Sequence, residues 1–134
     1  MVTLSAGEKP LPDFVLKQRY DIIGMKDIYL DFAGRMVESD PVHQHLRRLH
    51  VGDAVQLRKS GERLEICNLS GYPVAVLSKS GRDKWALAQD QIESINVMAL
   101  IERRADDVKE ASFKKLLKAD NWEVPVLEVV WRQS

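Results

Sequence analysis

The sequence predicts an α+β domain built on a small, strongly bent antiparallel, barrel-like β-sheet with two or three short helices. Three observations predict this class. Apolar residues fall in many short alternating runs, turns rich in glycine, serine and proline separate these runs, and helical patterns between them are few and short. A parallel doubly wound sheet would need long helices that alternate with the strands, and the sequence does not have that pattern.

The first elements expected are a strand and a capped helix. Alternating apolar and polar residues predict a strand over residues 26–32. Ser39 or Asp40, followed by Pro41, predicts the start of a short helix, because serine and aspartate cap helices and proline suits the first helical position. Gly52 is expected to end this region.

Three short strands follow as a meander, over residues 54–59, 63–69 and 72–77. A tight loop at residues 60–62 joins the first two as a hairpin. Residues 81–90 are expected to form only a single helical turn or a loop.

Two longer strands and a helix complete the domain. A long apolar strand is predicted over residues 92–101 and a final strand over residues 122–131. Between them, Asp107 is expected to cap a helix whose apolar stripe is formed by Phe113, Leu116 and Leu117.

The length of 134 residues corresponds to one domain, which is predicted over residues 20–134 after a flexible leader or linker at residues 1–19. The chain has 20 basic and 20 acidic residues, so its bulk charge does not indicate a strongly basic nucleic-acid binder. A single cysteine excludes an internal disulfide. No apolar stretch is long enough for a membrane span and no secretory signal pattern is present, so a cytoplasmic protein without membrane contact is predicted.

No sequence motif predicts catalysis. The nucleophile elbow G-x-S-x-G, the phosphate-binding loop, the dinucleotide fingerprint and HExxH are all missing. The paired carboxylates fit a helix cap and an exposed strand face better than an acid and a base across a cleft. His43 and His45 are two residues apart, whereas metal ligands on a helix are four apart. The chain alone is therefore predicted to have no enzymatic activity, metal or cofactor.

A mildly basic middle segment carries the candidate binding site. Residues 40–84 contain 8 basic and 5 acidic residues. Basic groups beside exposed aromatic rings can hold single-stranded nucleic acid, with phosphates on the cations and bases on the rings. The alternative is that Trp85 lies in the core and the charges form a solvated rim. The candidate nucleic-acid-binding residues from this segment and directly after it are Arg58, Lys59, Tyr72, Lys79, Arg82, Lys84 and Trp85.

Four segments, in order, resemble the C-terminal segment of long bacterial RecQ-type DNA helicases: HVGDAVQLRK, LEICNLSGYPVAVLSKSG, VMALIERRADD and DNWEVPVLEVVW. That segment is similar to the HIRAN family of small β-barrel modules. The resemblance runs from about Tyr20 to Trp131. It implies a groove that receives single-stranded DNA or a DNA end, with Tyr29 and Lys79 at the positions of the family's aromatic and basic contacts. The family's Asn-Pro-x-Asp-x-x-Ala-Ile run is replaced by residues 60–66, which weakens the case for recognition of a 3′-hydroxyl but not for backbone binding.

Two functions from different classes follow. The first is a non-catalytic, DNA-binding accessory domain of a RecQ-type helicase, which would hold single-stranded DNA or a DNA end for the motor domains of the same parent chain. The alternative is a protein–protein interaction module that uses an exposed β edge and binds no nucleic acid. Zero net charge and a C-terminal strand with two tryptophans favour this alternative.

Overall fold

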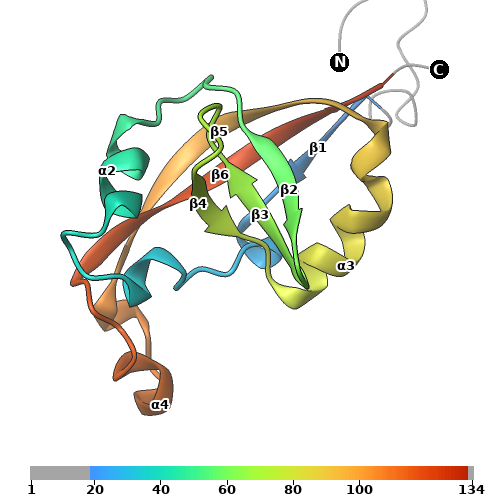
Figure 1. Ribbon diagram of the computed structural model, residues 1–134. Coiled ribbons are helices and arrows are strands. Elements are labelled where there is room, and N and C mark those ends of the chain that lie inside the picture. Colours follow the sequence, from blue (N-terminus) through green and yellow to red (C-terminus); the bar gives the residue numbers. More distant parts are fainter. Residues whose placement is uncertain (1–18, 133–134) are drawn as a thin grey trace, which may run out of the picture.

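Two three-stranded antiparallel sheets with short helices around them make up the fold (Figure 1). The computed structural model describes residues 19–132, so the predicted leader lies outside the described residues apart from Arg19. The first sheet has the order β1-β6-β5 and the second the order β2-β3-β4. The strands are β1 (Tyr20–Ile23), β2 (Gln56–Ser60), β3 (Arg63–Cys67), β4 (Pro73–Val76), β5 (Ile92–Arg104) and β6 (Asn121–Trp131). The predicted α+β class is confirmed.

Helical segments connect and flank the strands. Three α-helices in the described part of the chain are α2 (Pro41–Arg48), α3 (Lys79–Ala88) and α4 (Ala111–Lys114). Short 3₁₀ helices are η1 (Met25–Asp27), η2 (Ala33–Arg35), η3 (Gln89–Gln91) and η4 (Ala105–Asp107). No helix within residues 19–132 is long and apolar enough to cross a membrane.

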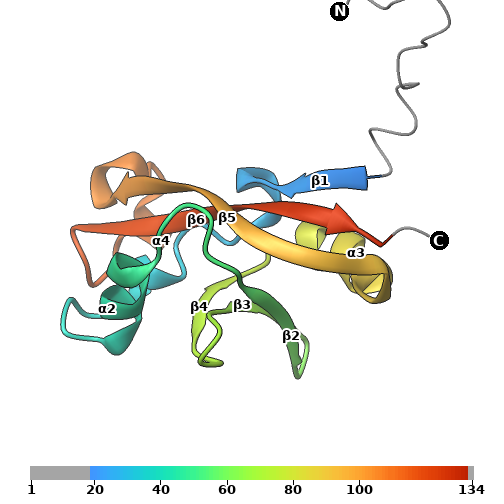
Figure 2. The same cartoon turned by 90° about the horizontal axis from the view of Figure 1, so that it is seen from above.

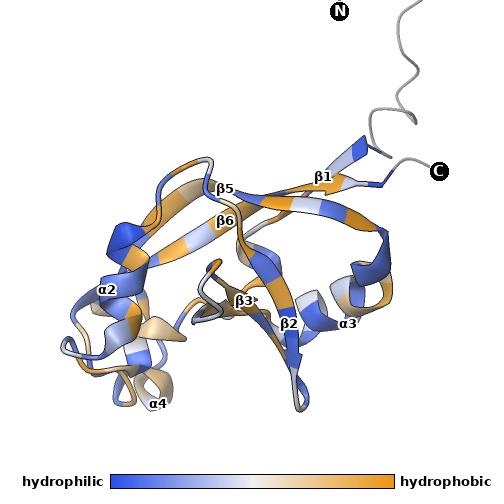
Figure 3. Cartoon of the chain, turned by 45° about the horizontal axis from the view of Figure 1, so that its top comes forward, coloured by the Kyte–Doolittle hydropathy of each residue, from blue (hydrophilic) through white to orange (hydrophobic). Residues whose placement is uncertain are grey.

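The core lies between the two sheets, because the small sheet β2-β3-β4 crosses the long hairpin of β5 and β6 (Figures 1 and 2). Ile66 of β3 and Leu127 and Val129 of β6 are completely buried there. Figure 3 shows apolar segments on β3, β5 and β6, with hydrophilic segments on the helices around them. Single β-bridges, from Ala54 to Asn96 and from Ile28 to Leu77, add further contacts between the elements.

Several predicted elements are confirmed with the expected local chemistry. The Asp40 carboxylate accepts a hydrogen bond of 2.9 Å from the Val42 amide and caps α2, which begins at Pro41. Gly61, at the tip of the β2–β3 hairpin, has a φ of 60°, a conformation that glycine adopts at little cost. Pro125 lies in β6 just before the stretch that pairs with β1, where its missing N–H can face a side without a partner strand.

The strand predicted over residues 26–32 is wrong. This segment forms η1, one β-bridge at Ile28 and a turn, and the first strand is β1 instead. The polar residues of the alternating pattern do not all face solvent: the Asp27 carboxylate accepts from the Trp85 indole at 3.2 Å, and Asp31 pairs with Arg103 at 3.0 Å. The alternating pattern therefore arises from side chains that bind other elements on two sides of a turn.

Residues 81–90 form more than one helical turn, because α3 already begins at Lys79. The Ser78 hydroxyl caps it and accepts from the Gly81 amide at 3.1 Å. Gly81 makes the segment a poor helix by propensity. A Cβ at this position would overlap the backbone carbonyl of Asp27, so close packing of α3 on η1 requires glycine.

The helix predicted after Asp107 is confirmed only as a single turn, and Asp107 does not cap it. Asp107 lies in η4, where its carboxylate accepts from the Arg104 amide at 2.8 Å, and α4 is a single turn that begins at Ala111. Of the expected apolar stripe, Leu117 is partly buried against the core, whereas Phe113 is 58% exposed and Leu116 is 40% exposed.

Candidate nucleic-acid interface

Six cations lie on segments of the chain that contact one another along one side of the molecule, which we call the basic end. They are Lys26, Arg35, Lys59, Arg63, Lys79 and Arg82. The contacts described in the next two paragraphs bring these segments together. Three of the cations, Lys59, Lys79 and Arg82, were predicted from the sequence.

The first turn of α3 contacts both η1 and the tip of the β2–β3 hairpin. The Arg82 guanidinium donates a hydrogen bond of 2.6 Å to the carbonyl oxygen of Glu62. The Ser78 hydroxyl donates to the carbonyl oxygen of Lys26 at 3.1 Å. Lys79 therefore lies between η1 and the hairpin. At the tip of this hairpin, Arg63 of β3 is paired with Ser60 of β2.

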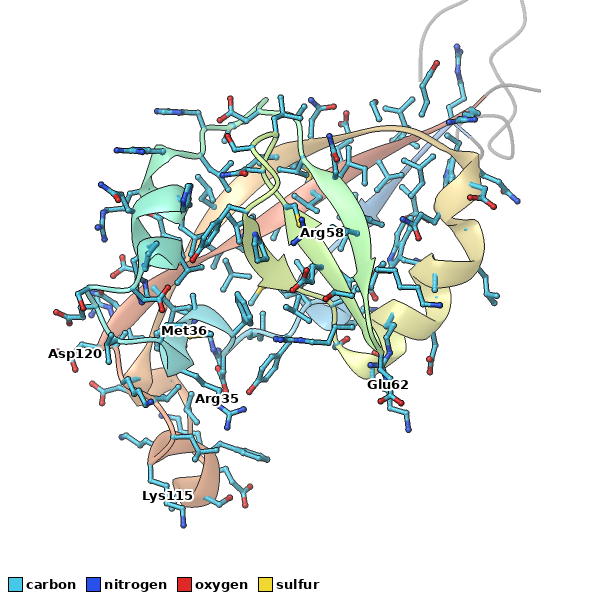
Figure 4. The ribbon with its side chains drawn as sticks, viewed as in Figure 1. Arg35, Met36, Arg58, Glu62, Lys115 and Asp120 are labelled. Carbon is cyan, nitrogen blue, oxygen red and sulfur yellow. The ribbon has the colours of Figure 1, made fainter. Side chains whose placement is uncertain are left out.

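A second set of contacts joins the hairpin to the turn that contains Tyr29. The Arg63 guanidinium lies over the ring of Phe32, 5.4 Å from its centroid. Arg35 donates to the Tyr29 hydroxyl at 3.0 Å, and the Tyr29 amide donates to the carbonyl of Val76 in β4 at 2.8 Å. In Figure 4, Arg35 and Glu62 lie along the same lower side of the molecule.

The basic end has a local positive charge, although the whole chain is neutral. In the part of the chain that the structure describes, no hydrogen bond or ion pair holds the ammonium group of Lys59 or Lys79, and both side chains are exposed. Asp27, Glu62 and Asp83 are the acidic residues directly next to one of the six cations in the sequence, and the Asp27 carboxylate accepts a hydrogen bond from the Trp85 indole. A cluster of this kind attracts anionic groups such as phosphates more strongly than the net charge suggests.

The aromatic groups at this end are partly available. Tyr29 is half-buried, and its ring borders the exposed Arg35. Phe32 is only 8% exposed and supports Arg63 from below. Tyr29 can therefore offer a ring edge or hydroxyl to a ligand, whereas Phe32 positions a cation.

Three other predicted residues do not join the basic end. Arg58 donates to the Gly71 carbonyl at 2.8 Å and pairs with the buried Glu65 at 3.1 Å, so its charge is already engaged. Lys84 pairs with Asp21 of β1 at 3.7 Å. Tyr72 lies at the β3–β4 turn and stacks on His45, with ring centroids 4.1 Å apart.

Trp85 cannot stack on a base, which corrects its predicted role. The side chain is completely buried, its ring stacks on Trp131 at 5.5 Å, and its indole N–H is bonded to Asp27. The alternative interpretation, that Trp85 is a core residue, is confirmed. The reason is helical geometry, because residue 85 lies on the same face of α3 as Gly81, and this face packs on η1.

Sequence reasoning did not assign Lys26, Arg35 or Arg63 to the candidate site. Lys26 and Arg35 flank the segment that contains Tyr29, and a turn in this segment would have brought them to one side. Arg63 begins β3 directly after the hairpin loop, opposite Ser60. Its position beside a glycine turn was the available signal.

The histidines do not form a common site. The ring of His43 is buried and its Nε2 bonds the Met36 carbonyl at 3.0 Å. The Nδ1 of His45 lies 3.1 Å from the Asn68 amide nitrogen, and His50 is exposed beside Asp53. Among residues 19–132 no group of three or more metal-ligating side chains could hold an ion.

A cavity of about 180 Å³ lies between α2 and β6. Its lining includes Glu102 and Glu123, which are directly opposite each other on β5 and β6. One carboxylate oxygen of Glu123, Oε2, is buried and has no hydrogen-bond partner within the described residues. Like charges at directly opposite positions of a sheet are destabilising.

Cys67 is buried beside the Arg58–Glu65 pair. Burial raises the pKa of its thiol; Arg58 lowers it and Glu65 raises it to smaller extents. The cysteine is thus kept protonated at neutral pH and is a core residue, not a nucleophile.

No protein-family model, curated protein or solved structure matches this chain. The resemblance to HIRAN modules therefore stays a prediction.

Proposed function

We propose that this chain is a non-catalytic module that binds single-stranded DNA through the basic end and acts as an accessory domain of a RecQ-type helicase. The observation that carries the proposal is that six cations lie on contacting segments beside Tyr29, and that three of them, Lys26, Lys59 and Lys79, have ammonium groups without a partner among the described residues. Phosphates on such cations supply most of the affinity for nucleic acid without sequence preference. The parent helicase would supply the motor, in the cytoplasm and at the nucleoid.

The resemblance adds the expectation that the two sheets form one strongly bent, barrel-like unit of the HIRAN type. The bridge between Ala54 and Asn96 supports it, because it connects the segment before β2 to the edge of β5. In that arrangement Tyr29 and Lys79 would border the DNA groove, and both belong to the group of contacts that defines the basic end.

The test is a titration of fluorescein-labelled single-stranded and duplex DNA, at low and at higher salt. We expect preferential binding of the single strand, with an affinity that falls as salt rises. The double variant Lys59→Glu with Lys79→Glu should bind far more weakly and should reduce the salt slope by about two, one for each lost phosphate contact. Neither side chain has a hydrogen-bond or ion-pair partner among the described residues, so the fold should be retained.

The matched control is Arg47→Glu with Arg48→Glu on α2, which changes the total charge by the same amount outside the basic end. This control should keep most of the affinity. Equal losses in the two double variants would mean that only net charge matters and would refute a localised site.

The second candidate function is the addition of a partner strand to β5. Residues 52–55 cover the outer edge of β5 as far as Val97. The Gly52 amide donates to the Val97 carbonyl at 2.7 Å, and the Val55 amide donates to the Ile95 carbonyl at 3.0 Å. From Met98 onward, β6 is the only strand among the described residues that pairs with β5. An open edge of this kind can accept a strand. A concentration-dependent mass in light scattering, unaffected by DNA, would favour this function.

A further inference from the structure

We infer that the loop between β5 and β6 is a second contact for single-stranded nucleic acid, in which Phe113 stacks on a base and neighbouring lysines contact phosphates. This inference rests on the proposed function. We call residues 108–119 the Phe113 loop. Its ends are fixed and its tip is exposed, as the following contacts show.

The base of the Phe113 loop is anchored on the body of the protein. Val108 and Ala119 are buried at its two ends. The amides of Lys118 and Ala119 both donate to the Gly34 carbonyl, at 2.8 and 3.2 Å. In Figure 1, α4 projects away from the two sheets, so the tip of an anchored loop is presented to solvent.

The tip carries apolar groups that the fold does not use. Phe113 and Leu116 are 58% and 40% exposed, and they are three residues apart, so they lie on one side of the turn. Lys114, Lys115 and Lys118 surround them in the sequence. Among these lysines, Lys114 pairs with Asp106 at 3.5 Å, whereas the described chain provides no partner for the ammonium of Lys115.

The Phe113 loop is continuous with the basic end. Its anchor, Gly34, precedes Arg35, which is bonded to Tyr29. In Figure 4, Arg35 lies between the hairpin tip with Glu62 and the loop with Lys115, along one side of the molecule. A strand that binds the basic end can therefore extend over Arg35 to the loop.

An exposed ring among lysines matches the chemistry of a single strand. Aromatic rings stack on any base and cations hold the flanking phosphates, which is how sequence-tolerant sites are built. A protein partner for this tip would need acidic groups of its own to complement the lysines. The continuity of the loop with the basic end favours nucleic acid as the occupant.

The test compares oligothymidines of about 6 and about 15 nucleotides, which span the site sizes of small single-strand binders. Phe113→Ala should weaken binding of the longer oligomer by about tenfold and leave the shorter one, held by the basic end, nearly unchanged. Phe113→Tyr should restore the affinity because it can stack, whereas Phe113→Leu, equally apolar but unable to stack, should not. Leu87→Ala is the control, since Leu87 is 88% exposed on α3.

The outcomes separate the two proposals. If the wild type binds neither oligomer, both the proposed function and this inference fail. If Lys59→Glu with Lys79→Glu abolishes binding but Phe113→Ala keeps full affinity for the longer oligomer, the basic end stands and the inference is overturned. Rescue by Phe113→Leu as complete as by Phe113→Tyr would also overturn it, because an apolar side chain that cannot stack on a base would then be sufficient.

Discussion

Replacement of Gly81 by alanine should destabilise the protein, although alanine is the better helix former. In a solvated helix this change stabilises by about 1 kcal/mol. Gly81 is instead buried on the inner face of α3, and a Cβ there would overlap the backbone carbonyl and Cα of Asp27. Backbone atoms cannot rotate away as a side chain would, so α3 has to move from η1.

The size of the effect follows from what that movement breaks. Overpacking of a close contact costs about 1–3 kcal/mol. Displacement of α3 also weakens the hydrogen bonds from the Ser78 amide to Asp27 and from the Ser78 hydroxyl to Lys26, 2.8 and 3.1 Å long, at about 1 kcal/mol each. After the gain in helix propensity is subtracted, we expect a loss of about 2–4 kcal/mol in the free energy of unfolding.

Urea unfolding monitored by tryptophan fluorescence measures this loss, because Trp85 and Trp122 are buried and become exposed on unfolding. The loss should lower the urea midpoint by about 1–2 M. Ala86→Gly is the reciprocal control: Ala86 is exposed on the same helix, and its replacement should cost only about 1 kcal/mol. A Gly81→Ala protein as stable as the wild type, or more stable, would refute the packing argument.

Three further predictions concern buried charges and the thiol. Arg58→Leu leaves the Glu65 carboxylate buried without its partner and should lower the free energy of unfolding by about 1–3 kcal/mol, less than the loss of a partner from a fully buried pair because Arg58 is half exposed. Addition of Glu65→Gln in a double-mutant cycle, measured by urea unfolding, should recover part of the loss, and additive effects would contradict the pairing. Glu123→Gln should raise stability by about 0.5 kcal/mol, since it removes a like charge opposite Glu102, and a lower urea midpoint would contradict this. Burial raises the pKa of the Cys67 thiol, so the contribution of the thiol to stability is complete below the unfolded pKa of about 8.5 and is lost as the pH rises through the folded pKa. A thiol reagent should react slowly with native protein at neutral pH, and rapid labelling would show that the thiol is accessible.

The elements that the sequence predicts correctly are those determined by local chemistry. The cap at Asp40, the glycine hairpin at Gly61 and the long alternation of β5 each depend on residues close together in the chain. The wrong elements depend on distant contacts. The alternation before Phe32 arises because Asp27 and Asp31 bind partners 58 and 72 residues away, and periodicity alone cannot distinguish such anchors from a strand.

The candidate site was predictable in composition but not in arrangement, and α3 shows why. Read as a loop, the stretch from Lys79 to Trp85 presents all its side chains to one ligand. Read as the helix that forms, it separates them by the period of 3.6 residues: Gly81 and Trp85, four apart, share the buried face, while Arg82 reaches the hairpin carbonyl and Lys84 reaches β1. The capping residue Ser78 was the signal for the helix. Gly81 obscured this signal, because glycine lowers the helix propensity of the segment although packing on η1 requires glycine at this position. A residue that contradicts the local preference of its element therefore marks a tertiary contact, and at Gly81 that contact is what holds Lys79 and Arg82 at the basic end.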